Sequence, residues 1–204
     1  MAAKQLVYQT LRRIGYPLFG QKLSNVQGAE NLPGAGGYLI AANHVDFLDG
    51  FYISAAVGLA RNVPVYFLTA SNNYWWTTVA VQIKADRRGA IIDQAVRALT
   101  DGKVICNFIE GQRNPATKLL AGRTGTVRMA LTAGVPIVPL GIACSAGKNV
   151  GQSLMYLMSK NHHVTIKIGR PIRLPAADQP EDNDLRRYTH QVMHAIAPLA
   201  GKKI

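Results

Sequence analysis

The chain has 204 residues, of which 48% are hydrophobic and 17% charged, a composition that predicts one folded domain and excludes a disordered chain. Its 23 Lys and Arg against 11 Asp and Glu give a formal net charge of +12, which favours nucleic acid, an anionic membrane or a phosphorylated substrate as partner. Aromatic residues make up only 7%, and RNA-binding signatures and zinc-ligand spacings are absent, so no nucleic-acid partner is expected.

The N-terminal residues carry a basic amphipathic pattern. Its apolar members are Val7, Leu11, Ile14 and Leu18, and its basic members are Lys4, Arg12, Arg13 and Lys22. The spacing predicts a helix that bends or ends near Gly15 and Pro17. Two interpretations stand: the helix packs on its own core, or it lies among lipid headgroups. We assign residues 1–24 to a membrane-associating segment and residues 25–204 to the main domain.

The next informative stretch is a strand followed by a polar turn. The apolar run 38–42 predicts a buried strand that ends at Asn43 and His44, and a helical pattern starts at Phe47. An imidazole in such a turn is held by a sheet but stays open to substrate. With Asp49 five residues on, it has the parts of a general base and the carboxylate that orients it.

The five-residue spacing restricts how this pair can meet. Within one straight helix the two side chains would be separated by roughly 500° and would not share a face. They meet if His44 is in the turn and Asp49 in the first helical turn, with Asp46 as N-cap and Asp49 three residues later. The alternative is that both aspartates only cap a helix and that His44 is an ordinary turn residue.

Strand and helix patterns alternate along the rest of the chain. Further strands are expected at 65–69, 81–86, 103–109, 134–140 and 163–168, and helices at 47–59, 91–99, 123–133 and 184–199. About six strands alternating with helices predict a single-domain α/β sandwich with a central, mostly parallel or mixed sheet flanked by helices. The aromatic cluster 74–76 suits a membrane anchor or an acyl-pocket wall, and equally a core.

Several polar residues follow the expected strands. Arg87 leaves the strand at 81–86, where its planar fork could bind a phosphate or simply be solvated at a helix start. Glu110, Gly111 and Arg113 follow the strand at 103–109 and resemble a polar binding loop, since glycine lets backbone approach a ligand. Arg123 precedes a helix whose N-terminal amides could also face a phosphate.

Other polar residues carry weaker signals. Cys106 and Cys144 lie in apolar runs and are expected to be buried, reduced thiols of a cytoplasmic protein. His190 and His194 have a metal-compatible spacing, but no third ligand is evident in the sequence, so no metal site is expected. The chain has no uninterrupted run of eighteen apolar residues, which argues against a membrane-spanning helix.

Four stretches in this order resemble the four sequence blocks of the glycerolipid acyltransferases, particularly the bacterial 1-acyl-glycerol-3-phosphate acyltransferases. They are Asn43-His44-(four residues)-Asp49, residues 83–87, Phe108-Ile109-Glu110-Gly111-Gln112-Arg113, and Val135-Pro136-Ile137-Val138-Pro139. The resemblance covers residues 25–175 and implies a glycerol-3-phosphate acyltransferase-like fold. Ile109 and Gln112 depart from the proline and threonine usual in the family, which leaves the acceptor's identity open.

The resemblance implies a role for each matched residue. His44 would take the proton from the acceptor hydroxyl, and Asp49 would hold its ring. Arg87 would engage the acceptor phosphate. The acceptor site would be lined by Glu110, Gly111, Arg113 and Arg123, and the strand containing Val135 and Pro136 would shape the acyl-donor side.

The expected reaction moves a fatty acyl group from acyl carrier protein or coenzyme A to the sn-2 hydroxyl of 1-acyl-glycerol-3-phosphate, giving phosphatidic acid. The thioester is a co-substrate, and no cofactor is expected. The enzyme would be peripheral, on the cytoplasmic face of the cell membrane and in contact with an anionic lipid surface. One alternative is the same fold acting on another lysolipid, a glycolipid or an amino lipid; a non-enzyme alternative is a membrane-binding module.

Overall fold

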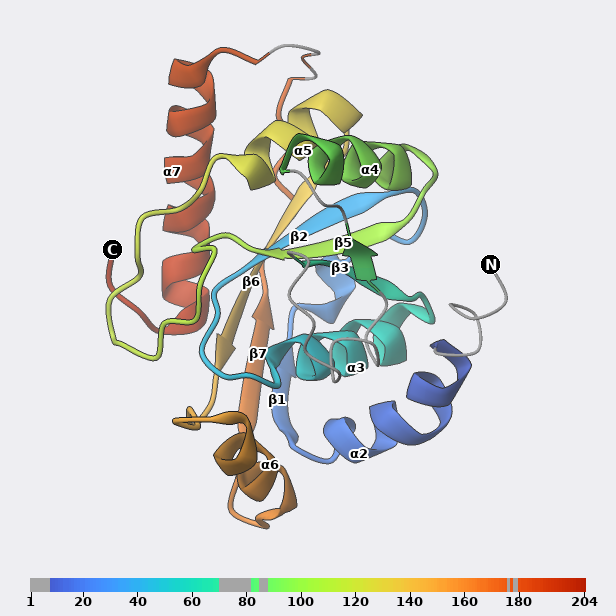
Figure 1. The fold of residues 1–204 in the computed structure, drawn as a ribbon, viewed down its shortest axis with the longest axis vertical. Helices are drawn as coiled ribbons and strands as arrows, with labels where there is room; N and C mark the ends of the chain where they lie inside the picture. The colour runs from blue at the N-terminus through green and yellow to red at the C-terminus, as the bar shows by residue number, and fades with distance from the viewer. Residues whose placement is uncertain (1–7, 70–81, 85–87, 176, 178–179) are drawn as a thin grey trace.

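The computed structural model describes residues 8–69, 82–84, 88–175, 177 and 180–204 (Figure 1). Arg87 and the aromatic cluster 74–76 lie outside these residues. The described strands form one seven-stranded sheet in the order β1-β7-β6-β2-β5-β3-β4. The strands are β1 (Leu23–Gln27), β2 (Tyr38–Ala42), β3 (Val65–Thr69), β4 (Gln82–Lys84), β5 (Val104–Phe108), β6 (Ile137–Ala143) and β7 (Val164–Ile168). Neighbours pair in parallel except β6 and β7, which are antiparallel.

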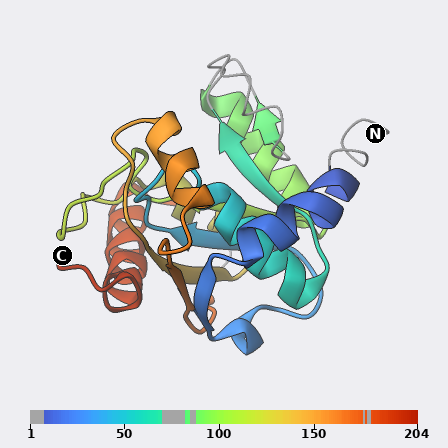
Figure 2. The ribbon, with the colours of Figure 1, turned by 90° about the horizontal axis from the view of Figure 1, so that it is seen from below.

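Helices cover both faces of the sheet. In chain order they are a π-helix (Leu11–Gly15), α2 (Tyr16–Gly20), a 3-10 turn (Ala29–Asn31), α3 (Asp49–Arg61), α4 (Arg88–Thr100), α5 (Gly125–Ala133), α6 (Val150–Met158) and α7 (Asp182–Ala200). Figures 1 and 2 place α2, α3 and α6 on one side of the sheet and α4, α5 and α7 on the other. The predicted single-domain α/β sandwich with a mixed sheet is confirmed.

The central strand β2 divides the core into two layers. Tyr38, Ile40 and Ala42 belong to the layer beneath α3, whereas Leu39 and Ala41 belong to the layer beneath α4, α5 and α7. This alternation follows from the two-residue period of a strand, and burial on both faces explains the unbroken apolar run 38–42. The strand therefore holds the residue that follows it on a rigid scaffold.

The N-terminal segment is part of this scaffold. The helix type changes from π to α after Gly15, at the predicted bend. Tyr16 and Phe19 are buried in the core layer of α3, whereas Ile14 and Leu18 of the predicted apolar stripe are exposed. The boundary predicted between residues 24 and 25 falls inside β1. Among the described residues, no helix combines the length and apolar character needed to cross a bilayer.

Candidate active site

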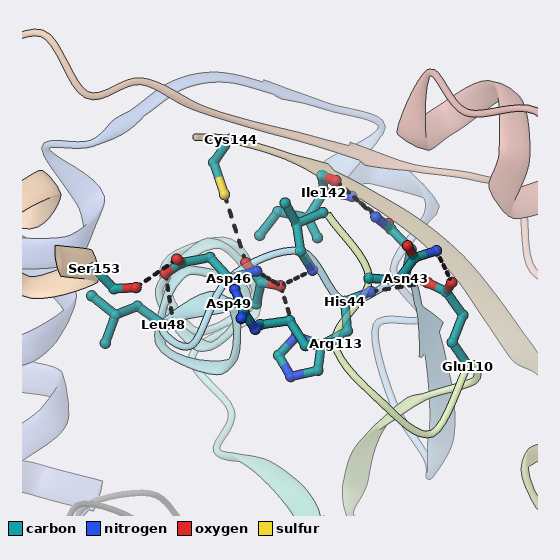
Figure 3. A network of polar contacts seen from close by, with 12 residues as sticks. Asn43, His44, Asp46, Leu48, Asp49, Glu110, Arg113, Ile142, Cys144 and Ser153 are labelled. Atoms are coloured by element: carbon teal, nitrogen blue, oxygen red, sulfur yellow. Dashed lines mark hydrogen bonds and ion pairs between the residues drawn. The ribbon is translucent and has the colours of Figure 1, made fainter. Parts of the chain in front are cut away.

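The candidate site lies where three strands end. β2, β5 and β6 run parallel, so their carboxyl ends meet at one edge of the sheet. His44 follows β2, Glu110 follows β5 and Cys144 follows β6. Ligands of open α/β sheets bind at such an edge. Figure 3 shows the polar network that joins these three segments.

His44 and Asp49 form a direct pair. The Nδ1 atom of His44 lies 2.9 Å from Oδ2 of Asp49, as the spacing predicted for a turn histidine and a first-turn aspartate. Oδ2 also accepts the backbone N–H groups of Val45 at 2.6 Å and Asp46 at 2.9 Å, which fix the carboxylate. A carboxylate only accepts, so Nδ1 carries the proton and Nε2 keeps its lone pair. The side chain of His44 is 21% exposed and that of Asp49 is fully buried, which suits a base open to substrate and a partner shielded from water.

The turn between the two residues differs from the expected cap. Helix α3 begins at Asp49, and Leu48 rather than Asp46 occupies the N-cap position. The Asp46 side chain closes the preceding turn instead, because its Oδ1 accepts the N–H of Leu48 at 3.0 Å. Its Oδ2 accepts from the backbone of Gly147 at 2.8 Å and from the hydroxyl of Ser153 at 2.6 Å. Asp46 therefore connects the His44 turn to the segment containing α6.

Two neighbours that sequence reasoning missed position the His44 ring. The side-chain amide of Asn43 exchanges two hydrogen bonds with the backbone of Ile142, at 2.9 and 2.8 Å, and so continues the pairing of β2 with β6. The ring of Phe108 stacks on the imidazole with centroids 3.9 Å apart and planes 12° apart. Both contacts join residues far apart in sequence, so local patterns do not predict them. An asparagine directly after a buried strand does indicate a side chain that hydrogen-bonds to backbone.

Glu110 is buried, and both of its oxygens are held by the protein. Oε1 accepts the backbone N–H of His44 at 3.4 Å. Oε2 accepts the side-chain amide of Asn114 at 2.6 Å and the N–H of Leu120 at 2.8 Å. The Asn114 N–H donates in turn to the carbonyl of His44 at 2.6 Å. The structure thus places Glu110 beneath the His44 backbone as a positioning residue, and direct contact with the acceptor stays a prediction.

Arg113 and Arg123 belong to the loop between β5 and α5, and Arg113 contacts the turn that follows His44. Arg113 donates to the carbonyl of Gly147 at 2.6 Å, and its guanidinium carbon lies 4.1 Å from the centre of the Phe47 ring. The side chain of Arg123 packs against Gly111, where a Cβ would come within 2.2 Å of Nε. Gly111 has a φ of 71°, a left-handed conformation that favours glycine, whereas the flexible side chain of Arg123 could move away from a Cβ. The guanidinium of Arg123 is exposed and available to an anion.

Two predicted residues, Val135 and Pro136, are not brought to His44. Arg87 lies outside the described residues. Val135 and Pro136 precede β6, at the end of the sheet opposite His44, because β6 runs parallel to β2 and Ala42 pairs with Leu140. Ile142 is hydrogen-bonded to Asn43, the neighbour of His44, and it lies six strand residues, or about 20 Å, beyond Pro136. Val135 and Pro136 are therefore far from His44, and their role on the acyl-donor side stays a prediction.

Other polar groups near the site have perturbed acidity. Burial, together with the carboxylates of Asp49 and Asp46, raises the pKa of the half-buried Cys144, whose Sγ lies 3.8 Å from Oδ1 of Asp49. Burial lowers the pKa of Lys202, which donates to the backbone carbonyl of Asn114. The thiol at residue 144 is therefore protonated near neutral pH and unsuited to act as a nucleophile.

The histidine pair of α7 stands apart from this network. His190 and His194 are exposed, with their Nε2 atoms 3.0 Å apart. In the described part of the chain, no three His, Cys, Asp or Glu side chains are grouped as metal ligands.

Comparison with known proteins agrees with this geometry. The family model described as Acyltransferase matches residues 24–143, well over half of the chain, from the second residue of β1 to the end of β6. The chain belongs to the Acyltransferase family. It is therefore an acyl-transferring enzyme, and the non-enzyme alternative of a membrane-binding module is wrong.

Relatives and a solved structure extend the comparison. This acyltransferase is 27% identical over 188 residues to the 1-acyl-sn-glycerol-3-phosphate acyltransferase of Haemophilus influenzae, covering 87% of this chain and 75% of that one. It is 30% identical over 129 residues to a probable 1-acyl-sn-glycerol-3-phosphate acyltransferase of Mycoplasma pneumoniae, covering 58% and 48% of the two chains. The crystal structure of the 1-acyl-sn-glycerophosphate acyltransferase PlsC from Thermotoga maritima superposes with a TM-score of 0.63 at 21% identity, covering 98% of this chain and 82% of that one, and shows the same fold.

Proposed function

We propose that this acyltransferase moves a fatty acyl group from a thioester, acyl carrier protein or coenzyme A, to the sn-2 hydroxyl of 1-acyl-glycerol-3-phosphate, giving phosphatidic acid. The observation that carries the proposal is the 2.9 Å contact between His44 Nδ1 and the buried carboxylate of Asp49, with the ring partly open to solvent. The names of the relatives from Haemophilus influenzae and Mycoplasma pneumoniae support this choice of acceptor.

His44 acts as the general base. Its Nε2 takes the proton of the acceptor hydroxyl while the hydroxyl oxygen attacks the thioester carbonyl carbon. The tetrahedral intermediate then collapses, the C–S bond breaks, and the thiolate takes the proton from the imidazolium. Asp49 keeps the ring in the tautomer with Nδ1 protonated and stabilises the imidazolium. A positioned base accelerates such a step by roughly 10²- to 10⁴-fold.

The acceptor phosphate binds to arginines around the turn. Arg113 and Arg123 belong to the loop after β5, and the exposed guanidinium of Arg123 suits a phosphate oxygen. Arg87 joins them in this proposal, on the resemblance of its sequence block. Glu110 holds the backbone of His44 in place for both substrates.

The acyl chain lies against aromatic rings beside His44. Phe108 stacks on the imidazole, and Phe67 lies 6.1 Å from Phe108 between ring centres, so the base has an apolar wall next to it. Because thiolate is a good leaving group, the transfer proceeds in this mechanism without a cofactor. We place the enzyme at the cytoplasmic face of the cell membrane, where a lysophospholipid acceptor is found and an anionic surface attracts its positive charge.

The proposal is tested by thiol release from acyl-CoA with and without 1-acyl-glycerol-3-phosphate. Release that depends on this acceptor supports it, and phosphatidic acid must form in equal amount. A parallel panel of other lysolipids, glycolipids and amino lipids, with one labelled acyl donor, tests the acceptor. Faster transfer to another member of the panel would overturn the assignment of acceptor while leaving the base mechanism in place.

A further inference from the structure

Helix α6 presents an uncovered apolar surface. Met155 is 72% exposed and Met158 is 76% exposed, and Leu154 beside them is also exposed. These three residues lie at spacings that form one stripe on a helix. The next turns of the chain do not cover them, so three large apolar side chains face water on a nine-residue helix.

The opposite face of α6 is firmly attached. Leu157 is buried in the core layer of α3, and the Ser153 hydroxyl donates to Asp46 at 2.6 Å. The side chain of Asn149 accepts the N–H of Gln152 at 2.9 Å and caps the helix. The exposed stripe therefore belongs to a fixed element that is bonded to the turn carrying the catalytic histidine.

The residues that follow α2 and α6 contact each other, and both helices lie on the α3 side of the sheet (Figures 1 and 2). The Nζ atom of Lys22, two residues after α2, donates to the carbonyl of Ser159, directly after α6, at 2.8 Å. Figures 1 and 2 show both helices at the same end of the fold. The N-terminal helices also carry exposed apolar residues, Ile14 and Leu18.

The charged residues that lie close in sequence to α6 and to the N-terminal helices are basic. The sequence contains no acidic residue from Met1 to Ala29, nor between Glu110 and Asp178. Lys148 and Lys160 flank α6 and are exposed. Arg12 and Arg13 are exposed on the N-terminal helix, adjacent in sequence to Ile14. Apolar side chains ringed by Lys and Arg are typical of elements that lie in the headgroup layer of an anionic bilayer.

We propose that the α6 stripe (Leu154, Met155 and Met158) inserts into the surface of an anionic lipid bilayer. The Ser153–Asp46 bond then holds the His44 turn at a fixed position relative to the membrane. This inference rests on the proposed function in that it names the surface through which the enzyme meets its lipid acceptor. Binding to vesicles can nevertheless be measured without any acceptor, so the two proposals fail separately.

The test measures binding of the full chain to vesicles by co-sedimentation. The vesicles contain equal parts of phosphatidylcholine and phosphatidylglycerol. Met155→Glu with Met158→Glu removes two apolar side chains and adds two negative charges, which should weaken binding by about tenfold or more. The matched control is Gln94→Glu with Gln191→Glu, which adds the same charge at exposed positions of α4 and α7, on the other side of the sheet. The control should change binding by less than about threefold.

The vesicle binding of the variant and of the control distinguishes insertion of the stripe from attraction by net charge. Unchanged vesicle binding of the Met155/Met158 variant overturns the proposal, and so does an equal loss in the control, which would mean that net charge alone drives binding. A wild-type dimer in solution that the Met155/Met158 variant breaks would make the stripe a contact between copies of the chain, and would also overturn it. Should the glutamate variant unfold, Met155→Ser with Met158→Ser removes the apolar groups without charge and gives the same test. Activity on detergent-dispersed acceptor should stay at the wild-type level in all these variants.

Discussion

Replacing Asp49 by asparagine removes one negative charge from beside the His44 ring with almost no change in shape. Two unit charges 2.9 Å apart at an effective dielectric constant of 20 attract by about 6 kcal/mol, an upper bound for the loss of imidazolium stabilisation. Since about 1.4 kcal/mol corresponds to tenfold in rate, we expect kcat for thiol release to fall by roughly 10²- to 10⁴-fold. KM for both substrates should change little, because Asp49 is fully buried and touches neither.

The same substitution has a separate cost in stability. The amide oxygen of asparagine can still accept the two backbone N–H groups of Val45 and Asp46, but without the charge. At about 1 kcal/mol lost per bond, the free energy of unfolding should fall by about 2 kcal/mol, measured by urea denaturation.

The matched control is Asp46→Asn. Asp46 is almost as buried and accepts three hydrogen bonds, but none comes from the imidazole. We expect a similar loss of stability with a fall in kcat of less than about tenfold. The reasoning is refuted if a folded Asp49→Asn enzyme keeps a kcat within about threefold of wild type.

Three further predictions follow from the site and its surroundings. Glu110→Gln places an amide where the carboxylate accepts hydrogen bonds from Asn114 and Leu120. The free energy of unfolding, measured by urea denaturation, should fall by about 1–3 kcal/mol, and kcat for thiol release should fall with it. An unchanged denaturation midpoint would contradict the role of this buried network in stability. Arg87→Ala should chiefly raise KM for the phosphate-bearing acceptor, and an unchanged KM would remove Arg87 from the phosphate site. Burial lowers the pKa of His162 below its ordinary 6.5. On acidification the unfolded chain therefore binds a proton at this histidine at a higher pH than the folded protein does, and the free energy of unfolding should fall as pH drops below about 6.5. His162→Phe should flatten that fall between about pH 7.5 and pH 5.5 in urea titrations, and an identical slope would show that other groups cause it.

Local patterns were sufficient to predict the contact between His44 and Asp49. The apolar run 38–42 predicted a strand, and the requirement that His44 lie in a turn and Asp49 in the first helical turn led to the geometry found. The strand 65–69 and the C-cap at Gly134 also follow from local signals, since a glycine at φ 65° ends α5. Each of these features depends on residues that are close together in the sequence, so it can be predicted from the sequence alone.

Features that depend on distant contacts could not be predicted in this way. β1 has mostly exposed residues and no apolar run, because it is an edge strand whose partner β7 lies far along the chain. The parallel pairing of β2 with β6, which puts Val135 and Pro136 at the end of the sheet opposite His44, joins strands almost a hundred residues apart. Helix α6 was missed although Asn149 is a local N-cap signal, and the bond from Ser153 to Asp46 spans more than a hundred residues.

The central claim is that His44 is the base that deprotonates the acceptor hydroxyl. The most direct measurement compares thiol release from acyl-CoA by wild type and His44→Ala, with 1-acyl-glycerol-3-phosphate present and folding checked by thermal melting. If His44 is the base, the variant should keep its melting transition and lose at least about a hundredfold in rate. A folded variant that releases thiol at close to the wild-type rate would contradict it.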